Sequence, residues 1–173
     1  HVALRIFSTT KTIVAGVNGA AFGAGAGLAL AADFRIGGPK TTFALNFTRL
    51  GFHPGFGTTY TLPRLVGQQK AAWLFYACPR VKGRKAAELG LLDELVEDTN
   101  ILSRAIDFAK EIAASAPLAV ASTRAALRVD LAQAVRDANA RELAIQMEQF
   151  QTADYREGLA AAHDRRKPRF VGT

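Results

Sequence analysis

The segment 12–33 constrains the fold more than any other part of the chain. A short β-branched run, Thr12–Val17, ends at the turn-forming pair Asn18–Gly19, which predicts a buried strand followed by a turn. Three glycines then alternate with alanines over residues 23–27, and Leu28–Ala32 consists of good helix formers. We therefore expect a strand, a loop in which backbones approach closely, and a short helix.

The remaining predicted elements change along the chain from short strands to helices. Further short strands are expected at Asp33–Ile36, Thr41–Leu45 and Leu92–Val96. Helices are expected at Gln68–Ala77, Arg84–Leu89, Ile101–Ala116, from Pro117 onward, at Leu131–Phe150 and at Thr152–His163. Strands that precede a run of helices predict an α/β core, residues 1–98, with a helical C-terminal region, residues 99–173.

Acidic residues are unevenly distributed. Asp33 is the only acid in residues 1–87, which carry 11 basic residues, whereas residues 88–173 carry 14 acids and 11 basic residues. Carboxylate chemistry in the first half must therefore come from Asp33, for which a cap or an ion pair with Arg35 is expected. The basic residues are scattered among glycine and alanine runs, without the interleaved aromatics of a nucleic-acid face, so no nucleic-acid partner is expected.

The single cysteine and the lack of long apolar runs bound other properties. One cysteine, Cys78, excludes an internal disulfide and a cysteine-based zinc site, and we expect no metal. It lies in an apolar run and is expected to be buried, and it fits a reducing, cytoplasmic compartment. No uninterrupted apolar run approaches the roughly 20 residues of a membrane span, so no membrane partner is expected.

The glycine run does not have the spacing of a nucleotide site. Its third glycine comes one residue too early for the dinucleotide-binding pattern, and no acid follows about 20 residues later. A second possibility is an oxyanion site, because free N–H groups at the start of a helix attract negative charge. The N–H of Ala24 would then bind a carbonyl oxygen that becomes an enolate. The alternative is that the glycines only permit close packing of strand and helix.

Four segments together resemble one known family. Residues 11–33 resemble the signature segment of the crotonase (enoyl-CoA hydratase/isomerase) superfamily. Phe43–Gly67 resembles its Pro-Gly-x-Gly loop and the following helix, Lys85–Val96 its Ala-x-x-x-Gly-Leu-Val element, and Asp154–Phe170 its C-terminal ending. The resemblance implies a crotonase-like spiral of ββα turns with a C-terminal helical trimerisation region, and a homotrimer or dimer of trimers. A chain that begins at His1 is expected to lack the early turns.

The resemblance also implies a substrate and its binding residues. Family members bind an acyl-CoA thioester, with coenzyme A as part of the substrate and no separate cofactor. Two backbone N–H groups hold the enolate; Ala24 corresponds to one, and the other lies upstream of this sequence. The substrate-binding residues implied are Phe22, Gly23, Gly25, Gly27, Phe47, Pro54 and Gly55.

Both catalytic glutamates of the family's hydratases are absent. Their positions are Gly27 and Phe47 here, and neither a hydrogen nor a phenyl ring can transfer a proton. The sequence therefore predicts enolate stabilisation without hydratase activity. The alternatives are a non-catalytic acyl-CoA-binding subunit and a subunit retained for assembly.

Several further residues are candidates for a functional role, and some of them also have a purely structural explanation. His53 is the one titratable side chain in the Gly51–Gly57 loop and is a candidate base; a structural hydrogen bond is the alternative. Further candidates are Asn46, Tyr60 and His163. The resemblance places Arg165, Arg166 and Lys167 where the family's C-terminal helix reaches the phosphates of coenzyme A, and a solvated basic tail is the alternative.

Overall fold

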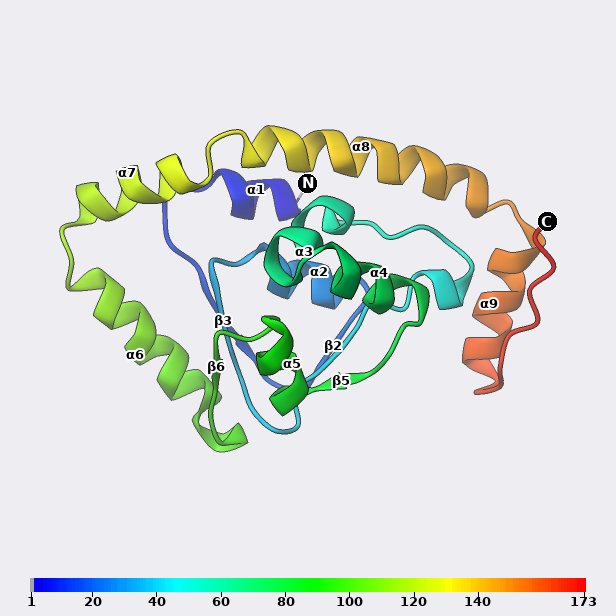
Figure 1. Ribbon diagram of the computed structural model, residues 1–173, viewed down its shortest axis with the longest axis horizontal. Coiled ribbons are helices and arrows are strands. Elements are labelled where there is room, and N and C mark those ends of the chain that lie inside the picture. The colour runs from blue at the N-terminus through cyan, green and yellow to red at the C-terminus, as the bar shows by residue number, and fades with distance from the viewer. Residues whose placement is uncertain (1) are drawn as a thin grey trace.

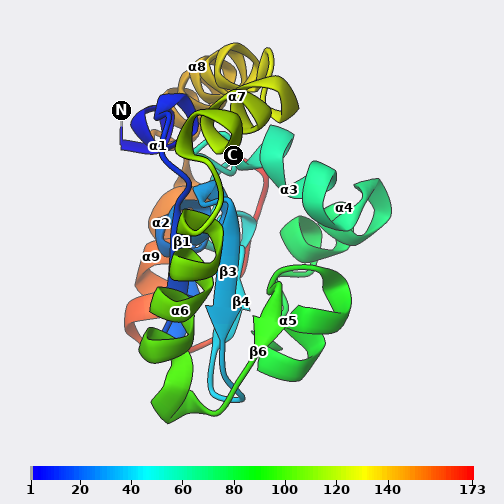
Figure 2. The same ribbon diagram turned by 90° about the vertical axis from the view of Figure 1, so that its left-hand side faces the viewer.

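Two small sheets form the centre of the computed structural model, which describes residues 2–173 (Figures 1 and 2). The first sheet is parallel and has the order β1 (Val14–Val17), β3 (Phe34–Gly37), β6 (Glu94–Leu95). The second has the order β2 (Ala20–Phe22), β4 (Thr42–Ala44), β5 (Val81–Lys82), with β4 and β5 antiparallel. The strand pairs β1–β2 and β3–β4 each give one strand to each sheet, and a helix follows each pair, as expected for successive ββα turns.

Helices surround these sheets. Those of the first half are α1 (Val2–Ser8), α2 (Ala24–Ala31), α3 (Thr58–Val66), α4 (Gln68–Tyr76) and α5 (Gly83–Leu89). Those of the second half are α6 (Ile101–Ala113), α7 (Pro117–Leu127), α8 (Leu131–Gln149) and α9 (Ala153–His163). The 3₁₀ turns η1 (Thr48–Leu50) and η2 (Asp98–Asn100) precede α3 and α6. Helix α8 runs along one side of the molecule, from α1 to α9 (Figure 1).

The main core lies where both sheets meet the helices. Its fully buried side chains include large aliphatic and aromatic groups from strands, helices and loops: Ile36, Phe43, Leu45, Leu62, Leu74 and Leu91. Helix α2 contributes small side chains, and Ala26 and Ala31 are completely buried. The alternating glycines and alanines therefore let α2 pack closely on its neighbours, while its first residues remain accessible.

The expected α/β fold is confirmed, and three elements had no sequence signal. β2 and β5 are strands, although Ala20–Phe22 has little β-branched character and β5 is only two residues long. Both are held by β4, through Ala21 opposite Phe43 and Phe43 opposite Val81. Pairing with an existing strand outweighs weak local propensity here. The third unexpected element is α1.

Helix α8 buries a different stripe from the one its large apolar residues indicate. Helical spacing predicts core or subunit contact for Leu131, Val135, Leu143 and Met147. Leu131 and Val135 are buried, whereas Leu143 and Met147 are 52% and 56% exposed. The inner face continues instead through Ala138 and Glu142, because α8 passes over the backbone of the loop before α3, where small and polar side chains fit.

Asp33 is bound by different arginines from the one expected. Its carboxylate lies 3.0 Å from Nε of Arg124 and 2.7 Å from Nη2 of Arg128, and it also accepts the N–H of Ile13. Arg35 instead pairs with Asp93 at 2.7 Å. The partners come from α7 and from the loop before β6, which sequence spacing does not bring near β3.

Helix α9 approaches η1 closely enough to require glycine. A Cβ added to Gly158 would lie 2.5 Å from the backbone of Leu50, and one added to Gly51 would lie 2.5 Å from the carbonyl oxygen of Asp154. Such distances leave no room for a side chain, so α9 is fixed against the segment that follows β4.

Cys78 is buried, as expected, and no helix within residues 2–173 has the length and apolar character needed to cross a membrane.

Candidate functional site

A cavity of about 500 Å³ opens at the N-terminus of α2. It joins most of the residues that the sequence predicted for substrate binding. The lining residues are Phe22, Gly23, Ala24, Asn46, Phe47, Leu50, Phe52, Gly55, Phe56, Asn139 and Gln146. We call this the acyl cavity. Its lining residues include backbone amides, aromatic rings and three carboxamide side chains, but no titratable side chain.

The backbone at the mouth of α2 offers hydrogen-bond donors. Gly23 precedes the helix with a φ of 50° and provides no side-chain cap. Its own N–H donates to the carbonyl of Ala44 and thereby fixes the turn, whereas the N–H of Ala24 belongs to the first helical turn, which has no earlier acceptor. Ala24 is exposed and lines the acyl cavity. Its N–H is thus suited to bind a carbonyl oxygen or an anion.

Aromatic side chains fill the two positions that correspond to the family's glutamates. A Cβ on Gly27 would lie 2.7 Å from Cβ of Phe56, so the Phe56 side chain covers the place where a side chain at position 27 would begin. Phe47 is 5% exposed and packs edge-to-face on Phe52, with ring centroids 5.7 Å apart. Both positions at which the resemblance implies a glutamate therefore lie among packed apolar groups.

The carboxylate of Glu142, on α8, is engaged in a structural role. Glu142 is 1% exposed; one oxygen accepts the N–H of Gly57 at 2.7 Å, and the other accepts the N–H and the hydroxyl of Thr59 at 2.9 and 2.6 Å. These donors belong to the first turn of α3, where a negative charge also interacts favourably with the helix dipole. Glu142 thus fixes the loop that forms one wall of the acyl cavity.

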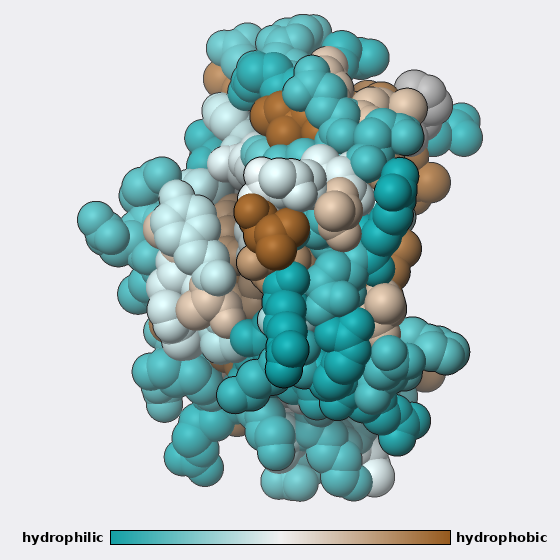
Figure 3. Space-filling view, turned by 90° about the vertical axis from the view of Figure 1, so that its right-hand side faces the viewer, coloured by the Kyte–Doolittle hydropathy of each residue, from teal (hydrophilic) through white to brown (hydrophobic). Residues whose placement is uncertain are grey.

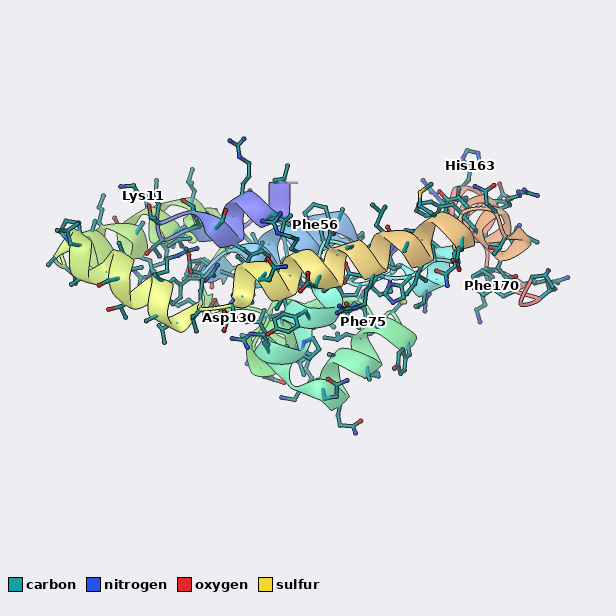
Figure 4. All side chains as sticks on the ribbon, turned by 90° about the horizontal axis from the view of Figure 1, so that it is seen from above. Lys11, Phe56, Phe75, Asp130, His163 and Phe170 are labelled. Carbon is teal, nitrogen blue, oxygen red and sulfur yellow. The ribbon has the colours of Figure 1, made fainter. Side chains whose placement is uncertain are left out.

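His53 lies outside the acyl cavity. It lines a second cavity of about 490 Å³, together with Pro54, Phe75 and Gln149. Its Nδ1 is 2.7 Å from the carbonyl oxygen of Pro54. Viewed from above, Phe56 and Phe75 lie on opposite sides of α8 (Figure 4). His53 and Pro54 therefore line a different cavity from Ala24, and Phe52 lines both cavities.

The remaining candidates are dispersed. Gly25 is exposed with nothing within 4 Å of an added Cβ, and Tyr60 lies beneath the guanidinium of Arg64. His163 is exposed at the end of α9. Only Asn46, of the additional candidates, lines the acyl cavity.

A basic cavity of about 720 Å³ adjoins the acyl cavity and shares Phe22, Asn46 and Leu50 with it. Five basic residues line it: Arg49, Arg80, Arg165, Arg166 and Lys167. The face that α9 and the C-terminal tail form is largely hydrophilic (Figure 3). The tail residues predicted to bind phosphate are thus brought next to the predicted thioester site.

Arg166 differs from its neighbours because its charge is already paired. Its two Nη atoms bind the two carboxylate oxygens of Glu157 at 2.6 and 2.8 Å. This hydrogen bonding, with a further bond from the N–H of Arg169, lowers the pKa of Glu157 from 4.5 to about 2. Among residues 2–173, neither Arg165 nor Lys167 has an acidic partner.

Among the charged and carboxamide side chains that line these two cavities, sequence reasoning missed four: Arg49, Arg80, Asn139 and Gln146. Arg80 lies over the ring of Phe22, 5.5 Å from its centroid, and Arg49 donates to the carbonyl of Ala77. Their local sequence gives no signal, since both depend on the fold for their position. Asn139 and Gln146 are seven residues apart, two helical turns, and this spacing marks a polar stripe on α8.

Within the described part of the chain, no group of three or more His, Cys, Asp or Glu side chains could hold a metal ion.

The successive ββα turns, with the N-terminus of α2 opening into a largely apolar cavity, agree with the crotonase-like fold that the sequence resembles. Comparison with known proteins agrees: the enoyl-CoA hydratase/isomerase family model matches residues 2–173. A crotonyl-CoA hydratase of Syntrophomonas wolfei is 34% identical over 93% of the chain, and a short-chain-enoyl-CoA hydratase of Clostridium acetobutylicum is 32% identical over 94%. The chain spans 62% of the length of each relative.

Comparison with solved structures points to the same family. An enoyl-CoA hydratase from Mycobacterium avium subsp. paratuberculosis superposes with a TM-score of 0.92 at 25% identity, covering 98% of this chain and 69% of that one. An enoyl-CoA hydratase/isomerase from Pseudoalteromonas atlantica gives 0.91 at 29% identity, with 98% and 68% covered. The chain belongs to the enoyl-CoA hydratase/isomerase family and has the crotonase fold.

Proposed function

We propose that this chain binds an acyl-CoA thioester in the acyl cavity and stabilises its enolate through the N–H of Ala24. The observation that carries the proposal is the exposed N–H at the start of α2, directed by the Gly23 turn and lining a largely apolar cavity. A backbone donor there binds developing negative charge without reorganising. The family resemblance implies a second backbone donor to the same oxygen.

The proposed activity does not include hydration of enoyl-CoA. Adding water across a double bond requires a base for the water and an acid for the carbon, and general acid–base groups typically contribute 10²–10⁴-fold each. No titratable side chain lines the acyl cavity, and Glu142 is held by three hydrogen bonds to the α3 terminus. These observations support a chemistry confined to enolate stabilisation, or binding without turnover.

Two assays test the proposal. Calorimetric titration with butyryl-CoA should show saturable binding, and absence of binding by the folded protein would exclude an acyl-CoA site. A hydration assay on crotonyl-CoA should show no turnover; a rate above about 1 per second, within the usual enzyme range, would contradict the assignment of the acids.

The basic cavity is proposed to bind the phosphates of coenzyme A. Arg165 and Lys167 lack acidic partners among the described residues and lie next to the acyl cavity, and Arg49 and Arg80 add charge to the same cavity. Lysine and arginine form strong charge-assisted hydrogen bonds with phosphate oxygens. A pantetheine chain leaving the thioester would pass the shared residues Phe22 and Leu50 to reach this cavity.

The helical region 99–173 is proposed to mediate assembly into a trimer or a dimer of trimers. It exposes large apolar side chains that a monomer would leave in water: Leu102 is 72% exposed, Leu118 85% and Leu127 74%. Contiguous exposed apolar patches mark interaction surfaces, and these side chains are proposed to contribute to one. Light scattering after size-exclusion chromatography would show a trimer or hexamer, and a stable monomer at micromolar concentration would contradict this proposal.

A further inference from the structure

Helix α8 supplies polar side chains to the acyl cavity that the family motifs do not include. Asn139 and Gln146 line the cavity and lie two helical turns apart on the inner face of α8. Both are half-buried. Helix α8 crosses the molecule above the loop that carries Phe56 (Figure 4). The wall opposite the N-terminus of α2 therefore presents carboxamides.

These carboxamides retain hydrogen-bonding capacity. The Nε2 of Gln146 donates to the carbonyl of His53 at 2.8 Å, which leaves its Oε1 without a donor among residues 2–173. Within the same residues, the side chain of Asn139 has no hydrogen-bond partner, and its polar atoms are not among the buried unsatisfied ones. Asn139 can thus donate and accept, and Gln146 can accept.

The position of the two carboxamides is fixed by the residue between them. Glu142 lies one turn from each and is anchored to Gly57 and Thr59 by three hydrogen bonds. Gln149, one turn further, accepts the N–H of His53 at 2.6 Å. These bonds hold α8 against the loop on both sides of Gln146 and one turn from Asn139, and the carboxamide of Gln146 is oriented by its own bond to His53.

The charge of the cavity limits what these groups can recognise. No Lys, Arg or His side chain lines it. A carboxylate on the acyl chain would lose hydration without gaining a counter-ion, whereas a hydroxyl or keto oxygen would gain a neutral hydrogen bond. A plain alkyl chain would leave the carboxamides without a partner.

We propose that Asn139, supported by Gln146, makes this site selective for acyl-CoA thioesters that carry a neutral oxygen substituent, a hydroxyl or keto group, on the acyl chain. This inference rests on the proposed acyl-CoA site and adds the chemical class of the acyl group. Asn139 is a specificity-determining residue that contacts the substituent, and Gln146 both accepts a hydrogen bond and positions the loop.

The test compares three ligands by calorimetry: butyryl-CoA, succinyl-CoA and 3-hydroxybutyryl-CoA, with both enantiomers of the last. The wild-type protein should bind the better enantiomer about tenfold more tightly than butyryl-CoA, the order of one or two added hydrogen bonds. Succinyl-CoA should bind more weakly than butyryl-CoA. Asn139→Leu should reduce the hydroxybutyryl preference, taken as the ratio of the two dissociation constants in that variant, to threefold or less. Gln133→Leu, on the exposed face of α8, is the matched control and should keep the wild-type preference.

The outcomes separate this inference from the function on which it rests. Binding of butyryl-CoA with no preference for the hydroxy compound, or a preference unchanged in Asn139→Leu, overturns the selectivity and leaves the acyl-CoA site intact. Tightest binding of succinyl-CoA also overturns it. If none of the three ligands binds to the folded protein, the acyl-CoA site and the selectivity both fail.

Discussion

Phe56 occupies the space that any side chain at position 27 would need. A Cβ built on Gly27 would lie 2.7 Å from Cβ and 3.0 Å from Cγ of Phe56, well inside van der Waals contact. Phe56 itself has a positive φ of 67°, unusual for a residue with a side chain, so the loop is shaped to deliver it there. The position of Phe56 therefore requires a residue without a side chain at position 27.

Gly27→Glu should consequently destabilise the protein without creating a hydratase. Overpacking a buried position typically costs about 1–3 kcal/mol, and urea denaturation should show a loss in this range. Crotonyl-CoA should remain unhydrated, since Phe47 still occupies the second position. Gly25→Glu, on the same helix with open space around it, should change stability far less. Gly27→Glu combined with Phe56→Ala should recover part of the lost stability. Equal stability of Gly27→Glu and Gly25→Glu would contradict the packing argument.

Ala24→Pro should remove the proposed enolate donor while leaving α2 intact. Position 24 is the first residue of the helix, where proline is well tolerated because the missing N–H has no helical acceptor. Loss of one oxyanion donor usually costs about 10²–10³-fold. Acetoacetyl-CoA, whose bound enolate is detected by ultraviolet absorbance, should lose at least 100-fold in enolate affinity. Ala24→Gly retains the N–H and should behave like the wild type; equal losses in both variants would show that the N–H is not the donor.

Sequence patterns predicted the scaffold of the site better than its walls. The strand–turn–glycine segment correctly placed α2, and Gly23, Ala24 and Phe47 meet in one cavity because consecutive ββα turns stack β2 beside β4. The first relationship is local in sequence, and the pairing of β2 with β4 follows from the repeated ββα turn. The residues that the sequence missed, Asn139 and Gln146, reach the cavity from almost a hundred residues further along the chain.

His53 illustrates why proximity in sequence misleads at a tight loop. It is two residues from Gly55, yet it lines the neighbouring cavity, where Gln149 accepts its N–H and Gln146 donates to its carbonyl oxygen. Leu143 and Met147, for which helical spacing predicts core or subunit contact, lie outside the core of this chain for a related reason. The prediction uses only the spacing of apolar residues. The residues that α8 buries are decided instead by the polar loop against which the helix packs.

Arg165 and Lys167 should matter more for coenzyme A binding than Arg166. Arg166 is already bound to Glu157 through two hydrogen bonds and would have to exchange partners. We expect Arg165→Ala and Lys167→Ala each to weaken acyl-CoA binding about fivefold, and Arg166→Ala to weaken it less than twofold, by calorimetry. With dephospho-CoA thioesters, the effect of at least one of the first two substitutions should shrink. A larger loss for Arg166→Ala would contradict this order.

The pair Glu157–Arg166 should make the C-terminal tail sensitive to acid. Hydrogen bonding to Arg166 lowers the pKa of Glu157 from 4.5 to about 2 in the folded protein. The carboxylate therefore contributes fully above pH 4.5, and the contribution is lost as the pH falls from 4.5 through about 2. NMR spectra of the Arg169 amide, which donates to Glu157, should stay unchanged at pH 4 and shift near pH 2. In Glu157→Gln the acid transition should disappear; a midpoint near 4.5 in the wild type would contradict the pairing.

Asp33→Asn should be among the most destabilising single substitutions in the chain, without affecting the site. Asp33 is the shared partner of Arg124 and Arg128, and the three side chains are only 10%, 8% and 15% exposed. Burial lowers the pKa of Arg128, and Asp33 opposes that effect, so removing the carboxylate leaves buried positive charge. Breaking a buried pair typically costs about 3–5 kcal/mol, measurable by urea denaturation. Asp107→Asn, at the exposed pair with Lys110, should cost less than about 1 kcal/mol.

Butyryl-CoA affinity should be unchanged in both variants, because Asp33 lines neither the acyl nor the basic cavity. A selective loss of binding in Asp33→Asn would instead give the only acid of residues 1–87 a role in the site.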